Sequence, residues 1–117
     1  MASVYKSFRT FIAELFPREK LQRVPIGAER DLLFSEEVGG EMLSAANIKC
    51  RTKANGPMQS MEPFLEGIRV EGRWVVLYSK YDIGCALERH TSADCVGYDP
   101  ASALRIATAA LRYNARP

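Results

Sequence analysis

The sequence predicts an α/β domain, and three stretches carry that prediction. The run Trp74–Tyr78 is continuously apolar and mostly β-branched or aromatic, which is typical of a strand buried on both faces. Ser7–Phe16 carries apolar side chains at helical spacing. Asp99 and Pro100 suit the cap and the first position of a closing helix. A chain of 117 residues forms one domain at most.

The first predicted helix is Ser7–Phe16. Its apolar residues recur at i, i+3, i+4 and i+7, which places them on one helical face. Pro17 should end the helix, because the residue before a proline disfavours helical backbone. We expect this face to pack in the core through Phe8, Phe11, Ile12 and Leu15.

Short elements joined by turns are expected in the middle of the chain. Leu21–Val24 and Ala46–Thr52 are predicted as brief strands, and Glu29–Phe34 as one or two helical turns. The Gly-Gly pair in Val38–Glu41 is interpreted as a turn, since a phosphate cradle needs a strand before it and a helix after it. Lys53–Met61 is predicted to be a loop. Alternating charges typical of an exposed edge strand occur at Lys49, Arg51 and Lys53.

A hairpin and a final helix complete the predicted elements. Phe64–Val70 and Arg73–Ser79 should pair antiparallel across the turn Glu71–Gly72. The second strand should be central, with both faces covered. Ala101–Tyr113 is rich in small residues, which permit close approach to a sheet. We expect its packed face to contain Leu104, Ala107 and Leu111.

Composition narrows the classes of function. Hydrophobic residues make up 47% and charged residues 26% of the chain, and the net charge is +2. We therefore expect no extended nucleic-acid-binding surface. No apolar run approaches the ~20 residues that span a bilayer, so direct membrane insertion is not expected. The first residues lack the apolar core of a signal peptide, and we expect a soluble chain.

The cysteines and the histidine predict neither a metal site nor a cofactor. Cys50, Cys85 and Cys95 are odd in number and contain no C-x-x-C pair. With His90 as the only histidine, a four-ligand zinc set is not expected. We also expect Cys85 and Cys95 to be free thiols rather than a disulfide.

Polar residues gather directly after the Trp74–Tyr78 run. Asp82, Cys85, Glu88 and His90 lie within nine residues and have side chains that can act as bases, nucleophile or ligands. They are therefore candidates for catalysis. The alternative is that Asp82 caps a helical turn, Cys85 packs, and Glu88 and His90 are solvated.

A ligand-binding role fits the same stretch better. In open α/β sheets, ligand sites gather at the carboxyl ends of strands. The predicted strand leaves the core where the sequence turns polar, and Gly84 would permit close backbone approach. If the protein binds a small polar ligand, we expect the contacts to come from Ser79, Tyr81, Asp82 and Cys85.

The chain also resembles a known family. The resemblance rests on S-F-R-T-F-I-A-E-L-F-P, on L-E-G-I-R-V-E-G-R-W-V-V-L-Y-S-K-Y-D-I-G-C-A-L-E and on A-L-R-I-A-T-A-A-L-R-Y-N-A. These stretches are similar to the bacterial family called domain of unknown function four-one-five-nine, over about residues 7–115. The family is grouped with class I glutamine-amidotransferase-like proteins. The resemblance thus implies a flavodoxin-like, three-layer sheet with flanking helices.

The resemblance covers only the carboxyl part of the family's domain. It implies that residues 1–117 are one domain or a fragment of one, whose partner is the missing amino-terminal part or another protein. Related domains can carry a catalytic histidine at the strand end where this chain has Lys80, Tyr81 and Asp82. No nucleophile elbow is present in the sequence. Family members often belong to cell-envelope proteins.

We therefore expect a non-catalytic ligand-binding or interaction domain of a larger protein. A degenerate amidotransferase-like hydrolase is the first alternative, which a complete set of catalytic partners in space would favour. A structural fragment that completes a larger protein is the second.

Overall fold

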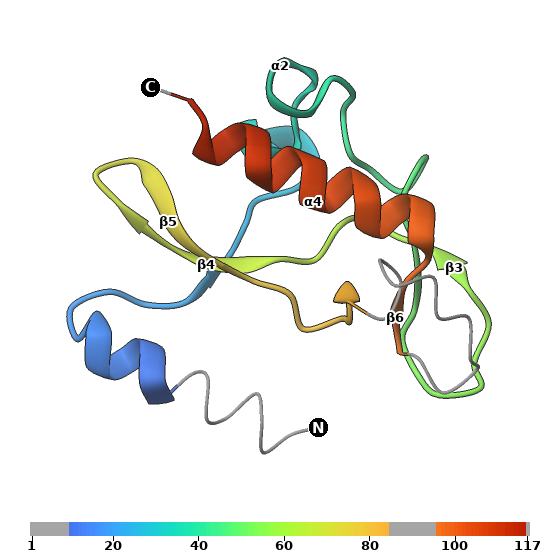
Figure 1. Cartoon of the computed structure of the whole chain (residues 1–117), viewed down its shortest axis with the longest axis horizontal. Helices are drawn as coiled ribbons and strands as arrows, with labels where there is room; N and C mark the ends of the chain where they lie inside the picture. The colour runs from blue at the N-terminus through green and yellow to red at the C-terminus, as the bar shows by residue number, and fades with distance from the viewer. Residues whose placement is uncertain (1–9, 85–95, 117) are drawn as a thin grey trace. The chain divides into compact units, whose positions relative to one another are not determined.

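The computed structural model of the chain describes residues 10–84 and 96–116 (Figure 1). The fold is mixed α/β, with helices and two three-stranded sheets. The chain divides into two compact units. The first unit consists of Met1–Val24 and Leu65–Lys80, and the second of Pro25–Phe64 and Tyr81–Pro117.

The first unit contains an antiparallel sheet in the order β1-β4-β5. Its strands are β1 (Gln22–Arg23), β4 (Glu66–Val70) and β5 (Arg73–Tyr78). The β4–β5 turn has positive φ at Glu71 (51°) and at Gly72 (78°), as a two-residue hairpin of type I′ requires. The predicted hairpin and the predicted first strand are confirmed.

Among the described strands, β5 lies at the edge of its sheet, so the prediction of a central strand over Arg73–Ser79 is wrong. Ile68 pairs with Val76 and Arg69 with Trp74, which leaves Val75 as the extra residue of a β-bulge. Trp74 is buried, but Val75 is 50% exposed. The apolar run therefore forms a bulged strand in which Trp74 is buried, Val75 is exposed and the following three residues are half-buried.

The buried face of the hairpin is organised around Trp74. A side chain at Gly67 would collide with the Trp74 ring and with the carbonyl oxygen of Val76, so only glycine fits beneath the ring. The guanidinium carbon of Arg69 lies 4.4 Å from the centroid of the same ring. This arrangement is a cation–π contact, so the ring packs against both Gly67 and Arg69, which are two residues apart on β4.

The amino-terminal helix is described over residues 10–15 and ends before Pro17, as predicted. Ile12 is buried, whereas Phe11 and Leu15 are each 56% exposed. The prediction that all the apolar residues of this helix pack in the core is therefore wrong for these two. Phe8, the fourth residue of that face, lies outside the described residues.

The second unit contains the remaining elements. Its helical elements are η1 (Gly27–Glu29), η2 (Leu32–Phe34), α2 (Glu36–Gly39) and α4 (Pro100–Asn114). Its strands are β2 (Lys49–Arg51), β3 (Gln59–Ser60) and β6 (Gly97–Tyr98). The predicted helical turns near Glu29–Phe34 and the predicted strand within Ala46–Thr52 are both present, although they are shorter than predicted.

The sheet of the second unit has the order β3-β2-β6, and both of its ladders are antiparallel. Strand β2 is therefore central, and the prediction of an edge strand at Lys49–Lys53 is wrong. The alternating charges of β2 do not indicate its central position, because its neighbour β6 comes from a distant part of the chain. A single parallel bridge joins Asp82 to Gly97. Among the described strands, no ladder forms the parallel sheet that a flavodoxin-like fold implies.

Helix α4 begins as predicted but packs through another face. The Asp99 side chain accepts a hydrogen bond from the Ser102 backbone N–H (2.9 Å), and Pro100 occupies the first turn. The buried residues of the helix are Ser102, Ala103, Ile106, Ala109 and Tyr113. The prediction of a packed face at Leu104 and Leu111 is wrong, because these leucines are 61% and 72% exposed.

Small residues explain the choice of face. A Cβ atom placed on Gly39, the last residue of α2, would lie 3.4 Å from the Cβ atom of Ala109. This close approach between α2 and α4 leaves no room for leucine at position 109. The core of the unit is completed by large apolar residues from other elements, including Leu33, Phe34, Leu43 and Ile48.

Candidate functional site

The structure describes only part of the site predicted from the sequence. Cys85, Glu88 and His90 lie outside the described residues. Ser79 belongs to the first unit, whereas Tyr81 and Asp82 belong to the second. That these residues form one ligand site remains a prediction.

Tyr81 takes part in an aromatic cluster of the second unit. Its ring makes edge-on contacts with Phe64 and with Tyr98, each with a centroid distance of 6.1 Å. The Tyr98 hydroxyl accepts a hydrogen bond from the Phe64 N–H (3.0 Å) and donates one to the Phe64 carbonyl (3.1 Å). Tyr81 therefore has a packing role that its position in the sequence does not reveal.

Asp82 is held in place through its backbone. Its N–H donates to the Val96 carbonyl (3.1 Å), and its carbonyl accepts from the Tyr98 N–H (3.1 Å). A side chain at Gly97 would overlap the backbone of Asp82, which explains the glycine at that position. The carboxylate belongs to an exposed residue at the end of this bridge.

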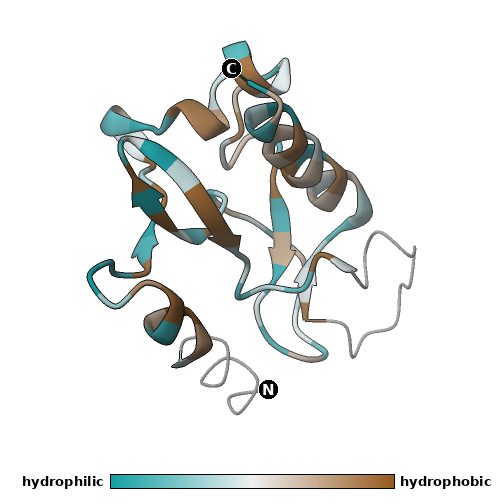
Figure 2. Ribbon diagram, turned by 60° about the vertical axis from the view of Figure 1, so that its left-hand side comes forward, coloured by the Kyte–Doolittle hydropathy of each residue, from teal (hydrophilic) through white to brown (hydrophobic). Residues whose placement is uncertain are grey.

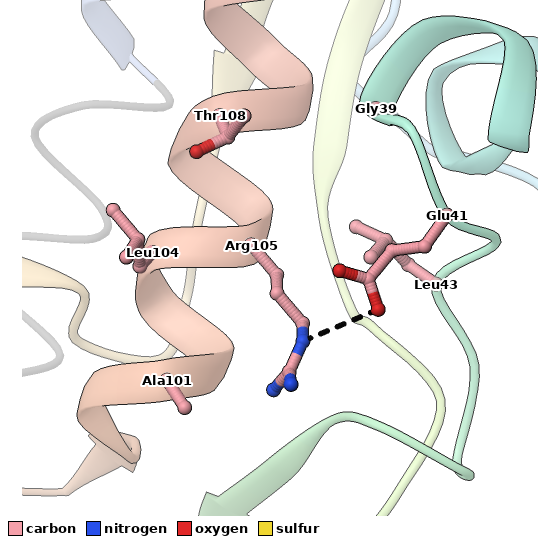
Figure 3. A pocket seen from close by; sticks show the side chains of 7 residues that line it. All are labelled: Gly39, Glu41, Leu43, Ala101, Leu104, Arg105 and Thr108. Carbon is pink, nitrogen blue, oxygen red and sulfur yellow. Dashed lines mark ion pairs between the residues drawn. The ribbon is translucent and has the colours of Figure 1, made fainter.

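A groove that the sequence analysis did not predict lies within the second unit (Figure 3). It is an open cavity of about 290 Å³ between α4 and the segment that follows α2. The groove is lined by Gly39, Glu41, Leu43, Ala101, Leu104, Arg105 and Thr108.

A polar network forms one side of the groove. Arg105 and Glu41 reach toward each other from the helix and the loop, and Nε of Arg105 lies 3.4 Å from Oε1 of Glu41 (Figure 3). Nη1 of Arg105 also donates to the Asn47 carbonyl (3.1 Å), and the Asn47 amide donates to Oε1 of Glu41 (2.9 Å). These contacts fix the guanidinium beside the groove and use only some of its five N–H donors.

The outward face of α4 continues from this groove as an apolar stripe. We define the α4 stripe as Ala101, Leu104, Thr108 and Leu111, which recur at i, i+3, i+7 and i+10 and so share one helical face. The helix thus has two apolar faces, one packed and one exposed. Figure 2 shows hydrophobic and hydrophilic colours on the same helix.

Two arginines border one side of the stripe. Arg105 and Arg112 are seven residues apart and therefore lie on the same flank of α4. Arg112 is exposed, and its Nη1 lies 3.2 Å from the position that a Cβ atom on Gly40 would take. Both guanidinium groups thus reach toward the 39–41 segment.

A family model described as Domain of unknown function (DUF4159) matches residues 1–114. The chain belongs to this family. No curated protein matches the chain, and no solved structure matches it.

In this DUF4159 chain, the described cysteine is not a reactive nucleophile. Burial, with a smaller contribution from the charge of Asp99, raises the pKa of Cys50 to about 12. The thiol therefore stays protonated near neutral pH, whereas a nucleophile must be a thiolate. Near the predicted site, partial burial raises the pKa of Tyr78, and the negative charge of Glu66 adds to the rise.

The described part of the DUF4159 chain shows no metal-binding group of three or more His, Cys, Asp or Glu side chains. Within the same residues, no helix is both long enough and apolar enough to cross a bilayer. The prediction of no metal site remains untested, because Cys85, His90 and Cys95 are not among these residues.

The α4 stripe was missed because its leucines were assigned to the core. One signal in the sequence could have revealed it. The closing helix has small residues on one face and leucines on another, and close packing through the small residues would leave the leucines exposed.

Proposed function

We propose that this chain is a non-catalytic protein-interaction domain, and that the α4 stripe with its groove binds a helical segment of a partner protein. The observation that carries the proposal is the exposure of Leu104 (61%) and Leu111 (72%) on one face of a 15-residue helix. Burying the exposed parts of both side chains would contribute about 2–4 kcal/mol to association.

The geometry of the surface favours a helix as the bound segment. The two leucines are separated by about two helical turns, so apolar residues at i, i+3, i+4 and i+7 of a second helix can pack between them. The groove beside Leu104 has a volume of about 290 Å³, which suits one large anchoring side chain. Leu43 forms a buried apolar part of the lining.

The lining of the groove supports binding rather than catalysis. Its ionisable groups are Glu41 and Arg105, which pair with each other, and its hydroxyl group belongs to Thr108. A catalytic nucleophile needs a base within hydrogen-bonding reach, and among the described contacts Oε1 of Glu41 meets Arg105 and Asn47 rather than Thr108.

We also propose that this domain is part of a larger protein. We propose that the chain is the carboxyl part of an amidotransferase-like domain, as its resemblance implies. Because the ladders of the described strands are antiparallel, the parallel sheet of a flavodoxin-like, three-layer fold would come from another part of that protein. The separate expectation of a polar ligand beside Tyr81 and Asp82 is not needed for this function.

Binding to a designed helix tests the proposal. The probe is an acetylated and amidated amphipathic peptide of about four helical turns, with leucines at i, i+3, i+4 and i+7. Amide chemical shifts should change along residues 101–111 and 39–43. Replacing Leu104 and Leu111 together by serine should weaken binding at least about tenfold, because two apolar contacts are lost.

The matched control is Leu15→Ser, since Leu15 is 56% exposed but lies on the amino-terminal helix. This variant should bind the peptide like the unchanged chain. The proposal fails if the peptide leaves residues 101–111 unperturbed, or if the Leu15 variant weakens binding as much as the double variant.

A further inference from the structure

The charges beside the α4 stripe are asymmetric. Arg105 and Arg112 lie on one flank of the helix, between the stripe and the buried face. The other flank presents no charge, since it consists of Pro100, Ala107 and Asn114. A partner helix that covers the stripe therefore meets positive charge along one of its sides only.

The two arginines differ in how far they are neutralised. Arg105 is paired with Glu41 and donates to Asn47, so part of its charge is compensated. Arg112 forms no ion pair within residues 10–84 and 96–116, and it is exposed beside Gly40. Arg112 thus contributes more than Arg105 to the positive charge that a partner encounters.

The same asymmetry disfavours a second copy of this chain as the partner. In a two-fold dimer with α4 antiparallel to its copy, symmetry places the arginine flanks of both helices on the same side. Arg105 of each copy would then lie near Arg112 of the other copy, which places like charges beside each other. An acidic partner would instead place its carboxylates beside Arg112, while Glu41 remains paired with Arg105.

We propose that the partner segment is an acidic amphipathic helix, whose leucine-like residues cover the α4 stripe and whose Asp or Glu residues run along the flank that faces Arg105 and Arg112. This inference rests on the proposed function, since it names the chemistry of the partner for the same surface. The Asp or Glu residues of the partner determine the orientation of the bound helix, because the opposite flank of α4 carries no charge.

A charge-reversal experiment tests the inference. Two peptides share the leucine pattern of the designed helix; one carries glutamates along a single flank, and the other carries lysines there. At low salt, the glutamate peptide should bind the unchanged chain about fivefold more tightly than the lysine peptide. The difference should shrink as salt is added, because exposed charges are screened. Arg112→Glu should reverse the preference.

Two further variants make the result specific. Lys53→Glu removes an exposed positive charge from the turn after β2 and should leave the preference for the glutamate peptide unchanged. Arg112→Gln should reduce the preference without reversing it, and it supplies the test if Arg112→Glu does not fold. Circular dichroism establishes that each variant is folded.

The outcomes separate this inference from the proposed function. Equal binding of both peptides, with shifts along residues 101–111, would overturn the acidic partner but leave the interaction surface in place. If neither peptide perturbs the helix, the proposed function itself fails. Binding to phosphatidylglycerol vesicles that depends on Arg112, without peptide binding, would identify a membrane surface instead. A dimer broken by Leu104→Ser would identify a second copy of the chain.

Discussion

Replacing single residues of α4 by alanine should lower the free energy of unfolding much less on the exposed apolar face than on the packed one. Leu104 is 61% exposed, so folding buries only about two-fifths of its side chain. Full burial of a leucine contributes about 1.5–3 kcal/mol, and Leu104→Ala should therefore cost about 0.5–1 kcal/mol. Alanine also has the higher helix propensity, which reduces this cost by a few tenths of a kcal/mol.

Ile106 is the matched comparison, since it is two residues away on the same helix but only 2% exposed. Ile106→Ala removes packed atoms and leaves a cavity between α4 and the rest of the second unit, so it should cost about 2–5 kcal/mol. Leu111 is 72% exposed, and Leu111→Ala should cost less than Leu104→Ala.

Urea denaturation followed by far-ultraviolet circular dichroism measures these differences, because the signal reports helix content and α4 is the longest described helix. If Leu104→Ala costs as much as Ile106→Ala, Leu104 belongs to a core. The α4 stripe would then be unavailable to a partner.

Three further predictions concern the fold. Gly67→Ala should cost about 1–3 kcal/mol in a thermal or urea melt, because the new methyl group collides with the Trp74 ring; a neutral result would contradict the packing of β4 against that ring. Asp99→Ala should cost about 1 kcal/mol in a urea melt, because it removes the helix cap; an unchanged stability would contradict the capping role of Asp99. The pKa of Cys50 is about 12 in the folded chain and 9.0 for a free thiol, so the folded state holds this proton more tightly. The contribution of this proton to stability is complete below pH 9 and is lost as the pH rises toward 12. In urea denaturation, the free energy of unfolding of Cys50→Ala should therefore fall less between pH 9 and pH 12 than that of the unchanged chain.

Local signals in the sequence predicted the elements that depend on local chemistry. The Glu71–Gly72 turn fixes the hairpin because both of its residues have positive φ, a condition that a glycine in second position indicates directly. Asp99 and Pro100 mark the start of α4 because capping involves only neighbouring residues.

Long-range pairing could not be predicted in the same way. Strand β2 is central only because β6, which begins at Gly97, returns to its side. The apolar run that contains Val75 resembled a central strand, yet a bulge and an edge position expose that residue. A hydrophobic pattern shows which side chains are apolar, but it does not show which neighbouring residues cover them.

The packed face of α4 illustrates the same limit. Leu104 and Leu111 are the larger apolar residues, and hydrophobicity alone assigns them to the core. The structure buries Ala103 and Ala109 instead, and at Ala109 the close approach of Gly39 leaves no room for a larger residue. The packed face of α4 is determined by how well its residues fit against a segment more than sixty residues away. A single sequence does not show which distant segments pack together.

Chemical-shift mapping with the glutamate-flanked peptide tests the interaction surface most directly. The shift changes should fall on residues 101–111 and 39–43, and they should disappear when Leu104 and Leu111 are both replaced by serine. Changes centred on β5, or changes that persist in the double-serine variant, would contradict a partner-binding role for α4.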